Sequence, residues 1–131
     1  MTIVTSQEIA QFRSELSDYP EAMQALDVIE DCEGDLEDAA MALAIRAGQQ
    51  PQINNAEWLD VLARKCRAAI CQQEFREELL KGSYAGTVKY LATTPLLPEI
   101  LATPVLMYVV RQGVNSFCEP LDSQYKYMHK K

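Results

Sequence analysis

A tight corner at Gly34-Asp35, with a helical pattern on each side, constrains this chain more than any other feature of its sequence. From Pro20 onward, apolar side chains recur every three or four residues, as on one face of a helix. Gly34 can adopt a positive φ and end that helix, and Asp35 can then cap a second one. Gly48 marks the end of this second helix. The sequence therefore predicts two helices folded over the corner.

A third helix is predicted before this pair. Thr5 and Glu8 have the spacing of a capping box, in which each side chain bonds the backbone N–H at the other position. The helix runs from there to about Leu16. The helix after the corner carries a stripe of small and apolar residues, which lets a neighbouring helix approach closely; its members are Leu36, Ala39, Ala40, Leu43 and Ala47.

The residues around the corner resemble a known family. Gly34, Asp35, Leu36 and Glu37, with Ala39 two positions later, resemble the third-helix signature of ubiquitin-associated-like (UBA-like) modules, which also occurs in the N-terminal domain of translation elongation factor Ts. The resemblance implies a three-helix interaction module over residues 5–48. The alternative is an ordinary helix–corner–helix with an alanine-rich packing face.

The resemblance also implies where a partner would bind. UBA-like modules present an apolar patch in the first loop and near the end of the third helix. Tyr19 and Pro20 occupy the first place in this chain, and Leu43 and Ile45 the second. We expect these four residues to be protein-binding.

Charge divides the chain into two parts. Residues 1–48 hold 11 Asp and Glu against two Arg, a net charge of −9, and residues 49–131 hold 10 Lys and Arg against eight Asp and Glu, a net charge of +2. The polar, Pro-containing stretch 49–55 is the expected linker between them. An acidic module is a poor partner for phosphate backbones, so no nucleic-acid binding is expected.

The second part is predicted to be helical as well. Residues 56–81 have one continuous apolar stripe and form the longest predicted helix, which Gly82 ends. Shorter helices follow, two of them starting at Thr94-Pro95 and Thr103-Pro104, and a helical unit is expected over 56–120. Residues 121–131 are expected to be an extended or disordered tail. The predicted fold class is therefore all-α.

Residue types that perform chemistry are sparse. The only histidine is His129, close to the end of the sequence, and no serine or cysteine has the setting of a nucleophile. Carboxylates occupy capping or surface positions. No catalytic, cofactor-binding or metal-binding residue is therefore predicted, and the chain is not expected to be an enzyme.

Two smaller groups of residues bear on metal, redox or partner binding. The four cysteines (Cys32, Cys66, Cys71 and Cys118) form no Cys-x-x-Cys pair, and we expect reduced thiols in a cytoplasmic protein without a signal sequence. Arg64, Lys65 and Arg67 form a basic cluster, which is either a solvated helix face or a site for an acidic partner.

The most apolar segment is 96–110. It is shorter than the roughly 20 residues of a membrane span, and it contains Glu99 and Pro104, so no membrane insertion is expected. It has more apolar side chains than two short helices can bury between them. We therefore expect a homodimer that uses this segment.

These patterns favour a small non-enzymatic helical protein that acts through protein–protein interaction, as an adaptor or scaffold. The partner would be a protein, bound by the N-terminal module. The competing hypothesis is a structural, homo-oligomeric protein in which the N-terminal patch is packed internally. A third hypothesis, an enzyme with an unrecognised site, has no motif to support it.

Overall fold

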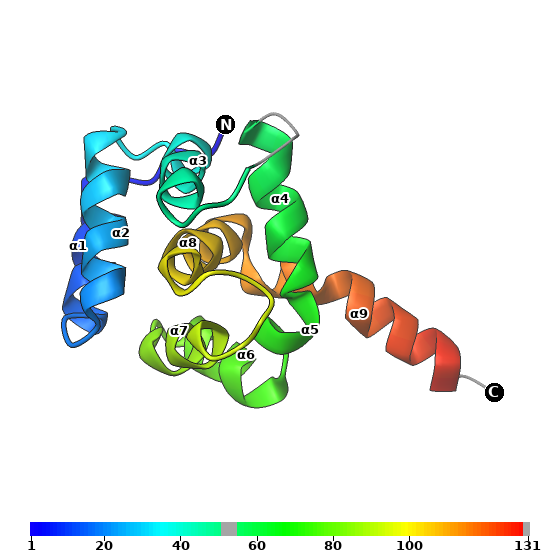
Figure 1. Cartoon of the computed structure of the whole chain (residues 1–131). Coiled ribbons are helices and arrows are strands. Elements are labelled where there is room, and N and C mark those ends of the chain that lie inside the picture. Colours follow the sequence, from blue (N-terminus) through cyan, green and yellow to red (C-terminus); the bar gives the residue numbers. More distant parts are fainter. Residues whose placement is uncertain (51–54, 130–131) are drawn as a thin grey trace.

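The fold is all-α, as the sequence predicts. A computed structural model describes residues 1–50 and 55–129, and within these residues it contains no strand. The helices are α1 (Ser6–Glu15), α2 (Pro20–Asp31), α3 (Leu36–Arg46), α4 (Asn55–Lys65), α5 (Arg67–Ile70), α6 (Gln73–Leu80), α7 (Ala85–Ala92), the 3-10 helix η1 (Glu99–Leu101), α8 (Ala102–Gln112) and α9 (Val114–His129). They surround α8, which lies in the middle of the bundle (Figure 1).

The three N-terminal helices start and end where the sequence predicts. The Thr5 hydroxyl accepts from the Glu8 N–H at 3.1 Å, and the Glu8 carboxylate accepts from the Thr5 N–H at 3.0 Å, which completes the capping box. Pro20 occupies the first turn of α2, where a backbone N–H has no acceptor within the helix, so the missing N–H costs no hydrogen bond. The Asp35 carboxylate accepts from the Asp38 N–H at 3.1 Å and caps α3.

The corner between α2 and α3 is also held by the segment before α1. Gly34 has a φ of 84°, as expected for a residue that ends a helix in the left-handed region. The Val4 N–H donates to the Gly34 carbonyl, and the Leu36 N–H donates to the Thr2 carbonyl, both at 2.9 Å. Residues 2–4 therefore lie along the corner and cover it.

A buried carboxylate fixes this segment further. Glu37 is 4% exposed, yet both of its oxygens have donors. One accepts from the Thr2 N–H at 2.6 Å and the other from the Thr2 hydroxyl at 2.8 Å. Because a buried charge is costly unless it is hydrogen-bonded, this pair explains how Glu37 is tolerated at the base of α3.

The prediction of one long helix over 56–81 is wrong. The chain forms α4, α5 and α6 in its place, with breaks at Cys66 and at Cys71-Gln72. Gln72 has a ψ of 140°, which is extended and interrupts the helical path. The sequence here has no Gly or Pro, so the turn depends on tertiary contacts: Cys71 is bonded to Cys118, and α6 packs against α7 and α9.

The helix start expected at Thr94-Pro95 is wrong as well, because residues 95–98 form an irregular segment before η1. The second expected start is close to correct. Thr103 and Pro104 lie in the first turn of α8, which begins at Ala102, and Gly113 ends that helix with a φ of 107°.

Helix α8 is the core of the molecule. Every residue from Leu101 to Met107 is buried, and α8 packs against α2, α3, α4, α7 and α9. The apolar surplus of segment 96–110 is therefore covered largely by this chain itself. The surplus was the reason for expecting a homodimer through 96–110, and the structure removes that reason.

The tail expected after Pro120 is helical. Helix α9 continues through Pro120 to His129 and projects from the bundle (Figure 1). Its first turns are anchored, since Val114, Phe117 and Cys118 are buried. Tertiary anchoring of the N-terminal half explains how the helix persists past a proline, which local propensity disfavours.

The parts on either side of the expected linker share one core. Phe12 of α1 stacks on Tyr84 with ring centroids 4.0 Å apart, and Arg111 of α8 forms an ion pair with Glu8 at 2.8 Å. The buried apolar residues form one continuous cluster across both parts. Of the expected linker 49–55, residues 51–54 lie outside the described residues. Independent folding of residues 5–48 stays a prediction.

We expect Gly34→Ala to destabilise the protein more than Gly48→Ala. Both glycines have nearly the same φ, 84° and 82°, so each alanine bears a similar left-handed strain of about 1–2 kcal/mol. A Cβ at Gly34 would lie 2.4 Å from the Val4 carbonyl oxygen, whereas a Cβ at Gly48 would meet nothing within 4 Å. Thermal unfolding of both variants separates the steric overlap with Val4 from the backbone strain that both variants share. Equal melting temperatures would show that the overlap with the Val4 carbonyl does not destabilise the protein.

Candidate functional site

The four residues expected to bind a partner do not form one exposed patch. Ile45 is 66% exposed, Pro20 is exposed and Tyr19 is half-buried. Leu43 has no exposed surface, because it faces the core from α3. Leu43 is therefore not available to a partner in this structure, which corrects its assignment as a contact residue.

The chain itself packs against the helices that carry these residues. Helix η1 contacts both α2 and α3. A hollow of about 250 Å³ is lined by Tyr19, Glu21 and Glu99 among others, and a second hollow of about 410 Å³ by Arg46, Glu99 and Ile100 among others. Residues of η1 therefore line hollows beside Tyr19 and beside the end of α3.

Another groove lies between α4 and the irregular segment 95–98. It has a volume of about 450 Å³. One wall comes from α4, and the opposite wall has a proline at each end. The lining residues are Gln49, Trp58, Val61, Leu62, Lys65, Pro95, Leu96, Leu97 and Pro98.

The local sequence explains both walls. Leu59, Leu62 and Ala63 of α4 face the core, and the helical period places Trp58, Val61 and Lys65 on the adjoining face. Trp58 is half-buried and Val61 is 45% exposed. In the other wall, Pro95 and Pro98 fix φ and lack N–H groups, which keeps the segment irregular and apolar.

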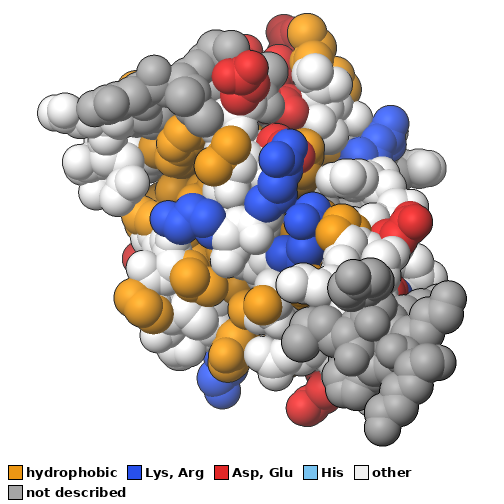
Figure 2. Space-filling model, turned by 90° about the vertical axis from the view of Figure 1, so that its right-hand side faces the viewer, with side chains coloured by type: hydrophobic (Ala, Val, Ile, Leu, Met, Phe, Trp, Pro, Cys, Tyr) orange, Lys and Arg blue, Asp and Glu red, His pale blue; other side chains and the backbone are white. Residues whose placement is uncertain are grey.

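Positive charge lies beside the groove. Figure 2 shows Lys and Arg side chains gathered on the face formed by α4, α5 and α9, with hydrophobic side chains next to them. Arg64 is paired with Asp60 on its own helix. The Arg67 guanidinium lies 4.8 Å from the centre of the Phe117 ring. Lys65, at the rim of the groove, makes no ion pair with the described residues.

Asp60 also fixes α4 against α8. The Tyr108 hydroxyl donates to the Asp60 carboxylate at 2.6 Å, and the same carboxylate pairs with Arg64. Burial, and next the hydrogen bond to Asp60, raise the pKa of Tyr108 above its usual value. Because this bond joins the helix of one groove wall to the central helix, it positions that wall.

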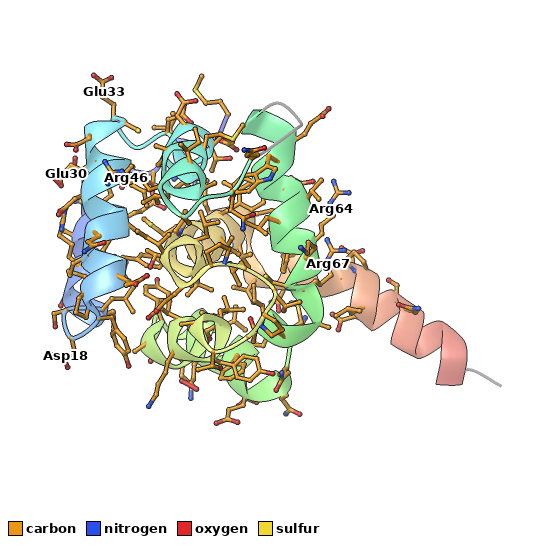
Figure 3. All side chains as sticks on the ribbon, in the orientation of Figure 1. Asp18, Glu30, Glu33, Arg46, Arg64 and Arg67 are labelled. Carbon is orange, nitrogen blue, oxygen red and sulfur yellow. A yellow bond between two sulfur atoms is a disulfide. The ribbon has the colours of Figure 1, made fainter. Side chains whose placement is uncertain are left out.

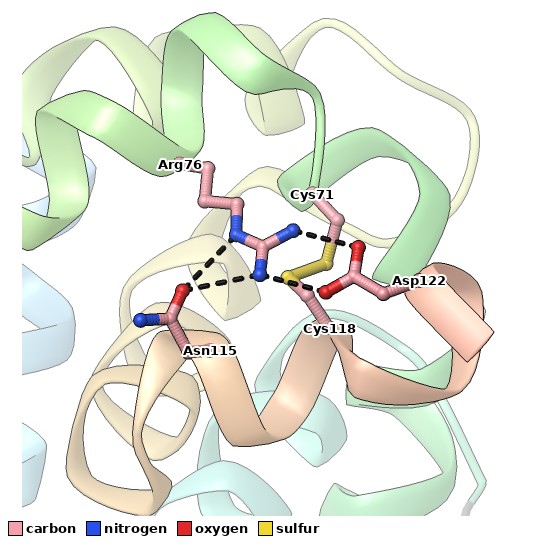
Figure 4. The surroundings of a disulfide bond; sticks show 5 residues. All are labelled: Cys71, Arg76, Asn115, Cys118 and Asp122. Atoms are coloured by element: carbon pink, nitrogen blue, oxygen red, sulfur yellow. Dashed lines mark hydrogen bonds and ion pairs between the residues drawn. A yellow bond between two sulfur atoms is a disulfide. The ribbon is translucent and has the colours of Figure 1, made fainter. Parts of the chain in front are cut away.

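A third cluster links α9 to α5 and α6 (Figure 4). Cys71 and Cys118 form a disulfide with their Cα atoms 5.8 Å apart, so the expectation of four reduced thiols is wrong for this pair. Their separation of 47 residues in the sequence hides the pairing. Arg76 donates to both oxygens of Asp122, at 2.9 and 2.8 Å, and to Asn115 at 3.1 and 3.2 Å. Cys32 and Cys66 are free.

The described residues hold no group of three side chains that could bind a metal ion. In the part of the chain that the structure covers, no helix is both long and apolar enough to cross a membrane.

Comparison with known proteins finds no match: no family model matches the chain, and no curated protein and no solved structure matches it. The UBA-like resemblance of residues 5–48 therefore stays a prediction from the sequence.

Only part of the groove can be predicted from the sequence. The apolar period over 56–81 places Trp58 and Leu62 on the inner stripe of one long helix, and Thr94-Pro95 predicts a helix start. The half-exposed Val61 lies three residues from Trp58 and four from Lys65, so helical spacing signals that these three share a face. No local sequence pattern signals that residues 95–98 lie opposite α4, because the contact between these two walls joins segments about 30 or more residues apart in the sequence.

We expect the free energy of unfolding to fall as pH rises above about 10, where a tyrosine in the unfolded chain loses its proton. Tyr108 keeps its proton in the folded protein, because its folded-state pKa is raised, so its contribution is complete below that pH and is lost above it. Tyr108→Phe should cost about 1–2 kcal/mol near neutral pH and should flatten the decline. Urea unfolding at several pH values measures both effects.

Tyr90→Phe is the matched control, since Tyr90 is 39% exposed. If the Tyr108→Phe and Tyr90→Phe proteins follow the same stability–pH curve, the Tyr108–Asp60 bond does not couple α8 to α4.

Proposed function

We propose that this protein is a non-enzymatic helical protein that binds another protein, as an adaptor or scaffold, through the groove between α4 and residues 95–98. The observation that carries the proposal is a groove with apolar side chains in both walls, in which Val61 of the α4 wall is 45% exposed and Trp58 lies on the same face. Exposed apolar surface in a concave site is typical of binding sites. The volume of about 450 Å³ suits a few side chains of a partner.

The occupant that fits best is a short segment of a partner protein with apolar anchors and a carboxylate. Apolar anchors match the walls, and Lys65 at the rim lacks an ion-pair partner among the described residues. Figure 3 shows Asp18, Glu30 and Glu33 at the α1–α2 edge, and Arg64 and Arg67 at the opposite edge. This separation of charge orients an acidic segment towards the groove.

We further propose that residues 5–48 are a UBA-like module used for structure. Three helices, the Gly34-Asp35 corner and the capped third helix support the module. The position of η1 against α2 and α3 supports internal packing of its patch, which is the competing hypothesis of a structural role. In that case a second copy of the chain could cover the groove on α4.

Selection of short random peptides displayed on phage tests the proposal. Peptides selected on the wild-type protein should combine apolar and acidic residues, and should bind the synthetic form with a change in the fluorescence of Trp58, the only tryptophan. Val61→Asp should abolish this binding. Leu80→Asp is the control, because Leu80 is 56% exposed but lies outside the groove. Equal loss in both variants, or no selected sequence, would contradict the groove as the binding site.

Charge reversal at the rim gives a quantitative prediction. Lys65→Glu should weaken a selected acidic peptide by about fivefold, which corresponds to about 1 kcal/mol for one ion pair near the surface. Lys81→Glu changes the net charge equally and lies outside the groove lining. Fluorescence titration should therefore show a smaller effect for Lys81→Glu. If sedimentation instead shows a dimer that Val61→Asp disrupts, the structural hypothesis is the correct one.

A further inference from the structure

Helix α9 is fastened to the bundle by a small number of separable contacts. The Cys71–Cys118 disulfide bonds it to the end of α5, and Arg76 of α6 donates from Nη1 and Nη2 to the two carboxylate oxygens of Asp122. On its inner side, Phe117 is 1% exposed. These contacts lie between residues 114 and 122, and the later turns of the helix project away from the bundle (Figure 1).

Most of the packing around α8 does not depend on these contacts, although the turn at Gln72 between α5 and α6 does. Helix α9 packs against α5, α6 and α8, whereas α8 is covered on its other sides by α2, α3, α4 and α7. Regions with few contacts to the remainder of a protein open locally, without global unfolding. Loss of α9 would leave most of the α8 packing in place and would uncover the apolar face that carries Phe117.

We propose that the Cys71–Cys118 disulfide is a redox-controlled latch for α9, closed when oxidised and opened by a dithiol reductant, and that opening exposes the Phe117 face while α1–α4, α7 and α8 stay folded. Once the disulfide is open, the burial of Val114 and Phe117 and the ion pair between Arg76 and Asp122 remain. The ion pair contributes little, because its side chains are 24% and 42% exposed and such pairs are screened by solvent. The disulfide adds a covalent contact, and its loss shifts α9 towards the open state.

The reaction is a thiol–disulfide exchange. Cys71 is partly exposed and Cys118 is fully buried, so the reductant thiolate attacks the Sγ atom of Cys71. The Cys71–Cys118 bond breaks, Cys118 leaves as a thiolate and takes up a proton, and Cys71 forms a mixed disulfide with the reductant. The second thiol of the reductant then attacks its own sulfur in that bond and releases Cys71. The protein gains two electrons and two protons, and the dithiol becomes a disulfide.

The free cysteines Cys32 and Cys66 do not readily exchange with the Cys71–Cys118 disulfide. Burial raises the pKa of the Cys66 thiol, and Cys66 has no exposed surface. Burial, and next the nearby carboxylates of Asp38 and Asp35, raise the pKa of Cys32. Because the thiolate is the attacking species, neither residue readily exchanges with the latch.

Hydrogen exchange of the full chain, with and without dithiothreitol, tests the latch. Reduction should speed exchange of the backbone amides in residues 114–124 by at least about tenfold, and should leave those of α2 and α3 unchanged. Cys71→Ser should exchange like the reduced protein without reductant, and Cys66→Ser like the oxidised protein. Faster exchange throughout the chain would show that the disulfide stabilises the whole fold. Unchanged exchange in residues 114–124 would show that the disulfide does not hold α9. Either result overturns the proposal.

Two further measurements guard against a variant that fails to fold. Alkylation of the denatured wild-type protein, prepared without reductant, should modify two of the four cysteines; modification of all four would overturn the latch. Asp122→Asn should speed exchange of residues 114–124 much more in the reduced protein than in the oxidised one, because the ion pair matters once the disulfide is open. Equal acceleration in both forms would contradict the disulfide as the deciding contact.

Discussion

Burial of α8 is the constraint on which the rest of the structure depends. Residues 101–107 are all buried, and Val109 at the other end of the helix has no exposed surface. Each buried aliphatic side chain contributes about 1.5–3 kcal/mol, whereas an exposed ion pair contributes about 0–1 kcal/mol. The position of the other helices is therefore set by the need to cover α8, and the surface charges adjust to that arrangement.

This constraint also decides which surfaces are left for a partner. Helices α2 and α3 cover part of α8, and the segment that leads into it passes over them as η1. Part of the surface of α2 and α3 is covered as a result. Next to η1 in the sequence, segment 95–98 meets α4 with Val61 and Trp58 only partly covered. The proposed binding site is thus a consequence of how α8 is covered, and its wall is positioned by the Tyr108–Asp60 bond.

The sequence interpretation failed where long-range contacts override local preference. Residues 56–81 have a helical apolar period throughout, but the chain turns at Gln72, beside Cys71 and its bond to Cys118. Residues after Pro120 have a tail-like composition, but α9 continues because its first turns are buried and Asp122 is bound by Arg76. In both cases the partner lies about 40 or more residues away, where periodicity and turn chemistry carry no information.

The sequence by itself determined the features that depend on neighbouring residues: the all-α class, the capping box at Thr5, and the corner where Gly34 adopts a positive φ and Asp35 caps α3. Each of these is governed by backbone sterics and hydrogen bonds within a few residues. Only the tertiary structure decided that Leu43 is buried, that Cys71 pairs with Cys118, and that Val61 faces a groove. These outcomes depend on which apolar faces meet around α8, and many packings satisfy the same local pattern.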